Sequence, residues 1–193
     1  MTADEKLPGS RRGRRNDPDR RDRIIEACLE VIADKGVNGT SHRSVARAAG
    51  VPLGSMTYYF TGMDDLLQAA FSCFAARFAE SFEKHLSAAT DLRSATEAVL
   101  AIILDNDSRR ASRALVISYE LYPLAAREPA YRALTSEWMR RSRAALELHF
   151  DPTTARMLDA LIEGLILHRA LDTDEGDPAV VVQAVGRIVG LPE

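Results

Sequence analysis

The chain has 193 residues, enough for one compact core or for a small head joined to a larger body. Hydrophobic residues make up 46% and charged residues 27%, a balance typical of a soluble globular protein that excludes a largely disordered one. The net charge of −3 is unevenly distributed, because residues 1–60 hold 11 Lys/Arg against 8 Asp/Glu, a net charge of +3, and the other 133 residues carry −6. A basic N-terminal part is therefore joined to an acidic remainder.

Neither export nor membrane insertion is indicated. The N-terminus is polar and then arginine-rich, without the apolar run and cleavage site of a signal peptide. The most apolar stretch, residues 158–171, contains charged residues and is shorter than the roughly 20 residues that a bilayer requires. The two cysteines, Cys28 and Cys73, suggest neither a disulfide framework nor a zinc site. We expect a cytoplasmic protein with no membrane span, metal or cofactor.

Residues 1–17 are predicted to form a flexible basic arm, since they lack apolar periodicity and contain two glycines and a proline. Seven arginines fall between Arg11 and Arg23. Such a run can follow a phosphate backbone, and Arg14 and Arg15 lie at its centre. Considered by itself, the arm could equally be a solvated tail without a partner.

The first helix is predicted over residues 18–35. Apolar residues recur at helical spacing from Ile24 to Ile32, with charged residues on the other side. Gly36 then supplies the expected stop.

Two short helices around a tight turn are predicted next. Thr40 or Ser41 can cap the second helix, and Gly50 ends it where a left-handed backbone is easiest. Pro52 suits the first turn of a third helix. Residues 41–60 therefore form a helix, a turn and a helix.

The rest of the chain is predicted to be helical throughout. An apolar face over residues 64–86 indicates a long rod that ties the head to the body. Further amphipathic segments follow: 92–105, 109–126, 129–149, 153–171 and 177–190. No strand-like alternation or internal repeat is found in the sequence. The prediction is an all-α protein with three parts: the arm 1–17, a three-helix head 18–62 and a larger C-terminal body 63–193.

Residues 41–60 have the spacing of a DNA-reading helix-turn-helix. The helix in the major groove must show polar groups on one side and be anchored on the other. Met56 and Phe60, four residues apart, are expected to be the inward anchors. The hydroxyl-bearing residues around them then face outward and suit phosphate and base-edge contacts: Ser55, Thr57, Tyr58 and Tyr59. For either tyrosine the alternative is a place in the core of a small three-helix head.

The run TSHRSVARAAGVPLGSMTYYF, from Thr40 to Phe60, resembles the DNA-binding head of the TetR family. The resemblance covers roughly residues 20–71 and includes the Ile-Ile-x-Ala start of the first helix at residues 24–27. Segments in both parts of the chain are similar to the RcdA-type branch of that family: residues 51–60, 136–139 and 162–164. The resemblance therefore extends over most of the chain.

The resemblance implies a homodimeric transcriptional regulator, usually a repressor, that binds a palindromic operator in double-stranded DNA and is released by a small molecule. Carried over by position, it implies DNA contacts from Arg43, Ser55, Thr57, Tyr58 and Tyr59. The expected DNA contacts also include Ser44, Leu53, Gly54 and Thr61, and Arg14 and Arg15 of the basic arm. The family often has an aromatic residue at the position of Thr57 and a lysine near Thr61 and Met63. These departures put the phosphate contacts there in question, and the arginine arm is one source of compensation.

A small apolar or amphipathic effector would need apolar walls and a few convergent polar groups in the body. Aromatic and polar residues on the body helices can supply them: Tyr119, Tyr122, Trp138, Met139 and Glu163. The same helices must also pack a core, so each of these residues could instead be a core or interface residue.

The last two predicted helices carry apolar stripes wider than one core requires, so the surplus is expected to meet a second copy of the chain. The expected interface residues are Leu158, Leu161, Leu165, Val181, Val185 and Ile188. An effector is expected to act on the heads of the dimer through the phenylalanine face of the 64–86 rod, which includes Phe78.

Two other functions remain open. An enzyme could use Asp159, Glu163 and His168, but His168 points away from the other two, and no nucleophile elbow, phosphate-binding loop or metal-ligand spacing accompanies them. A regulator could also be controlled by a partner protein, with a filled body and no effector site. A thermal-shift screen with small apolar compounds distinguishes these cases, because a ligand of the native state raises the melting temperature.

Overall fold

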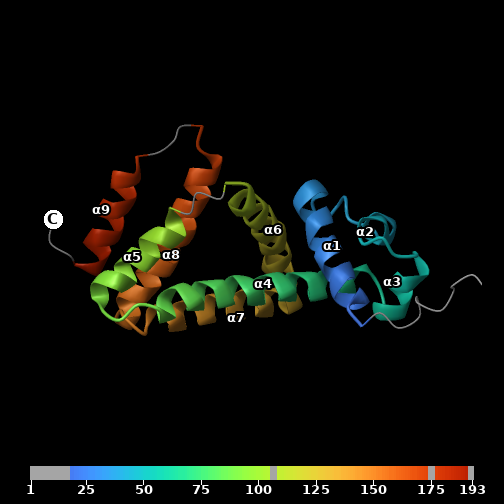
Figure 1. The fold of residues 1–193 in the computed structure, drawn as a ribbon, viewed down its shortest axis with the longest axis horizontal. Coiled ribbons are helices and arrows are strands. Elements are labelled where there is room, and N and C mark those ends of the chain that lie inside the picture. Colours follow the sequence, from blue (N-terminus) through green and yellow to red (C-terminus); the bar gives the residue numbers. More distant parts are fainter. Residues whose placement is uncertain (1–17, 105–107, 174–176, 191–193) are drawn as a thin grey trace, which may run out of the picture.

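The computed structural model describes residues 18–104, 108–173 and 177–190, and within these ranges the chain forms helices and no strand (Figure 1). The helices are α1 (Arg20–Lys35), α2 (His42–Ala48), α3 (Gly54–Tyr59), α4 (Met63–Ser87), α5 (Leu92–Ile103), α6 (Ser108–Arg127), α7 (Pro129–Leu146), α8 (Pro152–Leu171) and α9 (Pro178–Val189). The all-α prediction is confirmed, and the first and last residues of each helix lie within three positions of those predicted. The basic arm, with Arg14 and Arg15, lies outside the described residues.

The helix boundaries follow from local chemistry. Of the two predicted caps of α2, Ser41 is the one used: its hydroxyl accepts from the Ser44 N–H at 3.2 Å, and the Ser44 hydroxyl accepts from the Ser41 N–H at 2.9 Å. The same exchange of hydrogen bonds opens α5. Asp151 and Asp177 cap α8 and α9, each followed by a proline in the first turn. These signals are local, which explains why the sequence predicted the boundaries.

The head consists of α1, α2 and α3. Gly50 has a φ of 63° and supplies the left-handed residue that the turn between α2 and α3 requires. Val45 of α2 and Met56 of α3 are fully buried, and Phe60 is nearly so. All three belong to one apolar cluster with α1, so α3 is held with one face against the head.

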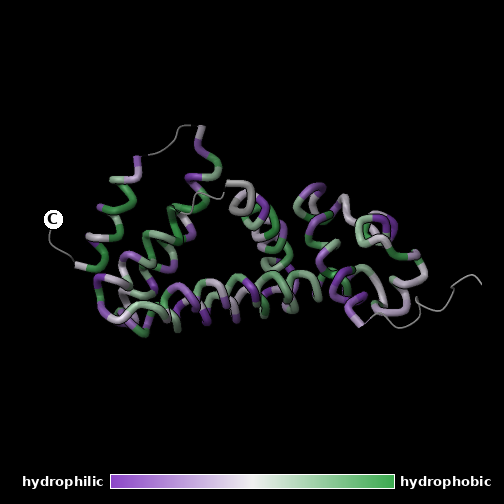
Figure 2. Tube along the Cα trace, in the orientation of Figure 1, coloured by the Kyte–Doolittle hydropathy of each residue, from purple (hydrophilic) through white to green (hydrophobic). Residues whose placement is uncertain are grey.

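Among the residues that the structure describes, the buried apolar side chains form two clusters, and the boundary between them falls inside α4. The first cluster joins the head to the first part of α4, as far as Ala79, and to parts of α6 and α7. The second joins the end of α4, from Phe82, to α5, the end of α7, α8 and α9. Figure 2 shows apolar stretches on the inward sides of these helices. The head therefore shares its core with the body.

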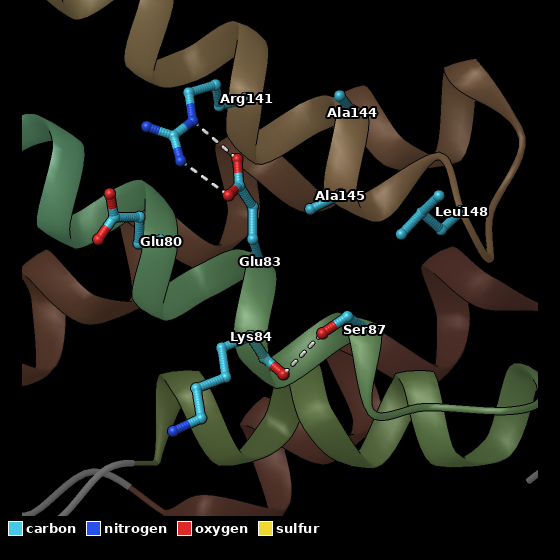
Figure 3. A pocket seen from close by; sticks show the side chains of 8 residues that line it. All are labelled: Glu80, Glu83, Lys84, Ser87, Arg141, Ala144, Ala145 and Leu148. Carbon is cyan, nitrogen blue, oxygen red and sulfur yellow. Dashed lines mark hydrogen bonds and ion pairs between the residues drawn. The ribbon is translucent and has the colours of Figure 1, made fainter.

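α4 and α7 run side by side along the base of the molecule and connect the two clusters (Figure 1). The Arg141 guanidinium of α7 binds both oxygens of Glu83 of α4 at 2.7 Å, as the two dashed lines in Figure 3 show. This hydrogen-bonded pairing lowers the pKa of Glu83. None of the helices described is long and apolar enough to span a bilayer.

Candidate functional sites

The outer face of α3 is a surface of exposed apolar and hydroxyl side chains. Met56 and Phe60 are buried, as predicted, and this places Thr57, Tyr58 and Leu53 on the outside. The side chain of Tyr58 is 81% exposed and that of Leu53 is 51% exposed. Large side chains left this open indicate a binding surface rather than a packing face. The core alternative is therefore wrong for Tyr58.

Tyr59 has a mixed position. It is half-buried and packs against the head cluster, and its ring meets that of Tyr58 edge-on, with centroids 4.8 Å apart. Ser55 is also half-buried, whereas Gly54 is exposed and has open space where a side chain would stand. Tyr59 thus contacts both the ring of Tyr58 and the apolar cluster of the head.

Some of the predicted DNA contacts have local hydrogen-bond partners. The Ser44 hydroxyl serves the capping box of α2. Thr61 donates its N–H and its hydroxyl to the same oxygen of Asp65, in the first turn of α4, at 2.9 and 3.2 Å. Arg43 is exposed at the start of α2, on the head.

Aromatic residues from α4, α6 and α7 meet in the body. The Trp138 ring centroid lies 4.9 Å from that of Phe78 and 5.8 Å from that of Phe74. Tyr122 stacks against Trp138 at 6.3 Å with 23° between the ring planes, and Tyr119 meets Tyr122 edge-on at 5.6 Å. Trp138 is buried, Tyr122 is half-buried and Tyr119 is exposed, so the cluster extends from the core to the surface.

The carboxylate of Glu163, on α8, lies beside the tyrosine end of this cluster. Burial raises the pKa of Tyr122, and the neighbouring Glu163 raises it further. The pKa of Tyr119 is raised in the same way by burial and by the Glu163 charge. One turn earlier on α8, Asp159 is paired with Arg143 at 3.1 Å, although burial raises the pKa of Asp159. Four of the five predicted effector residues are thus brought together.

Two surface pockets lie along the α4–α7 pair. The larger, about 480 Å³, is lined by Glu80, Lys84 and the Glu83–Arg141 pair together with Ser87 and apolar residues of and after α7 (Figure 3). The smaller, about 100 Å³, is lined in part by Trp138. Met139, the fifth predicted effector residue, is half-buried and lines neither pocket.

The structure corrects the predicted dimer interface. Leu158, Val181 and Val185 are buried in the second apolar cluster of the chain itself and so are not available to a partner. The remaining three, Leu161, Leu165 and Ile188, are half-buried against the same cluster. The large apolar side chains that α8 and α9 leave exposed are Met157, Leu171, Val180 and Val182. Both helices are apolar on more than one side, so the sequence did not show which side faces inward.

The residues considered for catalysis do not form one site. Asp159 is held by Arg143, Glu163 faces the tyrosines, and His168 is exposed. Within the part of the chain that the structure describes, no three His, Cys, Asp or Glu side chains gather as metal ligands.

Sequence reasoning missed two polar residues of α6 that contact the head. Glu120 accepts a hydrogen bond from the Val37 N–H, and Arg113 binds Asp34. Their partners lie 83 and 79 residues away in the sequence. No local pattern could have indicated them.

Two short helices around a tight turn, packed on α1 and with one face of the second exposed, define a helix-turn-helix DNA-binding protein. Residues 24–70 match the bacterial regulatory proteins of the tetR family, and residues 90–191 match the tetracyclin repressor-like C-terminal domain. The chain is 31% identical over 161 residues to the HTH-type transcriptional regulator BetI of Burkholderia thailandensis, covering 79% of this chain and 82% of that protein. The chain therefore belongs to the TetR family of transcriptional regulators.

Solved structures are similar over nearly the whole chain. The transcriptional regulator SCO7518 from Streptomyces coelicolor A3(2) is 52% identical, with a TM-score of 0.78, over 89% of this chain and 99% of that one. The multidrug binding protein EbrR in complex with ethidium is 36% identical, with a TM-score of 0.67, over 90% of this chain and 100% of that one. EbrR also has structures with malachite green and with proflavin.

Proposed function

We propose that this TetR-family regulator is a repressor released by an aromatic cation, which binds at Tyr119, Tyr122, Trp138 and Glu163, hereafter the effector site. The observation that supports this is the stacked Tyr122–Trp138 pair beside an exposed carboxylate. Aromatic faces attract cations and flat rings, and a carboxylate adds the opposite charge. The ethidium, malachite green and proflavin bound by the related EbrR are all aromatic cations.

Ethidium titrated into the protein without DNA is expected to quench the tryptophan fluorescence saturably, because Trp138 is the one tryptophan of the chain. Glu163→Gln removes the charge and keeps the shape, so it should weaken ethidium binding about tenfold, as expected for one charge-assisted contact. The matched control is Glu147→Gln, which replaces a carboxylate by a carboxamide at an exposed position just after α7. This variant should bind ethidium like the parent. Equal affinity of the parent and the Glu163 variant would remove the carboxylate from the effector site.

The DNA-reading surface of the proposal is the outer face of α3 with Arg43 of α2. Leu53 and Thr57 would meet base edges, while Tyr58 would donate its hydroxyl to a phosphate. The arginines of residues 1–17 would add affinity through charge. Support comes from the exposure of Tyr58 and from the anchoring of α3 by Met56.

Tyr58→Phe removes only the phenolic hydroxyl, so it is expected to lower operator affinity about three- to tenfold, the value of one lost hydrogen bond. The operator for this measurement is a duplex that the parent protein selects from a random-sequence pool, and binding is followed by fluorescence anisotropy. Tyr119→Phe makes the same chemical change in the body and should leave the affinity of the effector-free protein unaltered. A Tyr58 variant that binds as tightly as the parent would show that this hydroxyl makes no contact with DNA.

The active form in this proposal is a homodimer that pairs the exposed sides of α8 and α9. Their exposed apolar side chains support it, as does the open space at Gly164 of α8 and Gly186 of α9, where helices can approach closely. Residues 18–62 would read DNA, and residues 63–193 would bind the effector and the partner copy. We also place the chain in the RcdA-type branch, because Trp138 and Glu163 of the effector site lie in the similar segments 136–139 and 162–164.

A further inference from the structure

α6 makes a second connection between the body and the head, besides α4. Figure 1 shows α6 between α1 and α8. The Glu120 carboxylate of α6 accepts a hydrogen bond from the Val37 N–H at 2.8 Å. Its other oxygen lies where a side chain on Gly36 would stand, 2.7 Å from the position of an added Cβ. The carboxylate is therefore seated directly on the turn that follows α1.

This turn sets the position of the DNA-reading helices. Gly36 has a φ of 70°, in the left-handed region, and its carbonyl accepts the Thr40 hydroxyl at 2.8 Å. The next residue, Ser41, caps α2, and α2 packs against α3. A shift of Val37 would therefore be passed to the start of α2 over only four residues.

A second contact on α6 strengthens the attachment. Arg113 donates to an Asp34 carboxylate oxygen at 2.8 Å and to the Glu30 carbonyl at 3.4 Å, both near the end of α1. Arg113 and Glu120 are seven residues apart, which places them two helical turns apart on one face. The two contacts thus fix both the position of α6 along α1 and its rotation.

The same helix carries two residues of the proposed effector site. Tyr119 and Tyr122 flank Glu120 in the sequence and contact each other edge-on, with Tyr122 stacked on Trp138. Pro123 stands inside α6 and lacks the N–H that would bond the Tyr119 carbonyl, so the helix is weakened at this point. Any ligand that displaces the tyrosines acts on the segment that holds Glu120.

We propose that Glu120 is a positioning residue that couples the effector site to the head: its hydrogen bond to Val37 holds the DNA-binding orientation, and effector binding at Tyr119 and Tyr122 breaks it. The claim that effector binding breaks this hydrogen bond rests on the proposed function. The claim that the hydrogen bond holds the DNA-binding orientation does not. The route differs from the expected one through the phenylalanine face of α4. It reaches the turn before α2, whereas α4 begins after α3.

Measurements on the effector-free protein test whether the Glu120 hydrogen bond holds the DNA-binding orientation. Glu120→Ala is expected to lower affinity for the selected operator at least threefold, because the heads lose their fixed orientation, and to lower the hydrogen-exchange protection of the Val37 amide about tenfold. Glu120→Gln keeps an acceptor oxygen at the same reach and should restore operator affinity to within twofold of the parent. Glu147→Ala, a truncation of an exposed glutamate after α7, is the matched control. Parent-like operator affinity of Glu120→Ala would overturn the proposal.

Coupling is measured with malachite green, by comparing operator affinity with and without the dye on operator and non-operator duplexes. The coupling factor is the ratio of operator affinity without the dye to operator affinity with it. By linkage, the operator must lower the dye affinity of the protein by the same factor. In Glu120→Ala this factor should fall at least threefold while dye affinity without DNA stays within twofold of the parent, and an unchanged factor would overturn the coupling role. Arg113→Gln, with an exposed side chain, should reduce the factor in the same direction if Glu120→Ala proves unstable. A parent that binds no dye refutes the proposed effector and leaves the operator and exchange measurements to decide the role of Glu120.

Discussion

Met157→Glu combined with Val182→Glu is expected to produce monomers that bind the operator at least 100-fold more weakly than the parent. Both side chains are exposed, so the charges should be tolerated by the folded chain and should act only where a second copy approaches. In a dimer the second head binds intramolecularly, and this gain, typically about 100- to 10,000-fold, is lost in a monomer. Sedimentation velocity gives the mass, and anisotropy on the selected duplex gives the affinity.

Leu148→Glu is the control for this result. Leu148 is 66% exposed, lies just after α7 and lines the pocket along α4 and α7, so it belongs to neither α8 nor α9. It should remain a dimer with parent-like operator affinity. A double variant that still sediments as a dimer would place the interface elsewhere, as would a monomeric Leu148 variant.

Phe71→Ala is expected to lower the free energy of unfolding by about 3–5 kcal/mol, the usual cost of removing a fully buried phenylalanine. Phe71 of α4 has no exposed surface, and its ring meets Tyr131 of α7 edge-on at 5.9 Å. Because the cluster around it includes head residues, we expect the head and this part of the body to lose stability together. Denaturant unfolding at fixed protomer concentration measures the loss, since dimerisation also contributes to stability.

Two probes separate shared from independent loss in this variant. Trp138 fluorescence follows the body, and amide exchange in α2 follows the head. Phe78→Ala is the companion change. Its ring is only half-buried, so this substitution should lower the free energy of unfolding by less than Phe71→Ala does. If α2 in the Phe71 variant kept the protection of the parent while Trp138 lost its native fluorescence, the head would be stabilised independently of this cluster.

The helices and the reading face could be predicted because their determinants are local. Capping groups, the turn glycine and the helical spacing of apolar residues all act within a few positions, and they placed Ser41, Gly50 and the inward anchors Met56 and Phe60 correctly. Once Met56 points inward, the geometry of a helix turns Tyr58 outward. The exposure of Tyr58 therefore followed from the sequence.

The effector residues were only partly accessible to such reasoning. The sequence could nominate Tyr122, Trp138 and Glu163 by type, but not show that α6, α7 and α8 bring them together. Hydroxyls at Ser44 and Thr61 were nominated for DNA, and the structure shows that the first belongs to the capping box of α2 and the second donates to Asp65. When a polar side chain has several potential hydrogen-bond partners, its actual partner can be assigned only after the three-dimensional structure shows which of them lies within reach.

By itself, the sequence determined the all-α class, the order of the helices and the helix-turn-helix, because each depends on the backbone and on neighbours within about one or two turns. Only the tertiary structure decided which apolar side of α8 and α9 is buried, since Leu158 and Met157 are both apolar and neighbours in the sequence, yet the first is buried and the second exposed. The same holds for Glu120 and Val37, whose contact joins positions 83 residues apart. Such contacts are set by the packing of α6 against α1, and packing is a property of the whole fold.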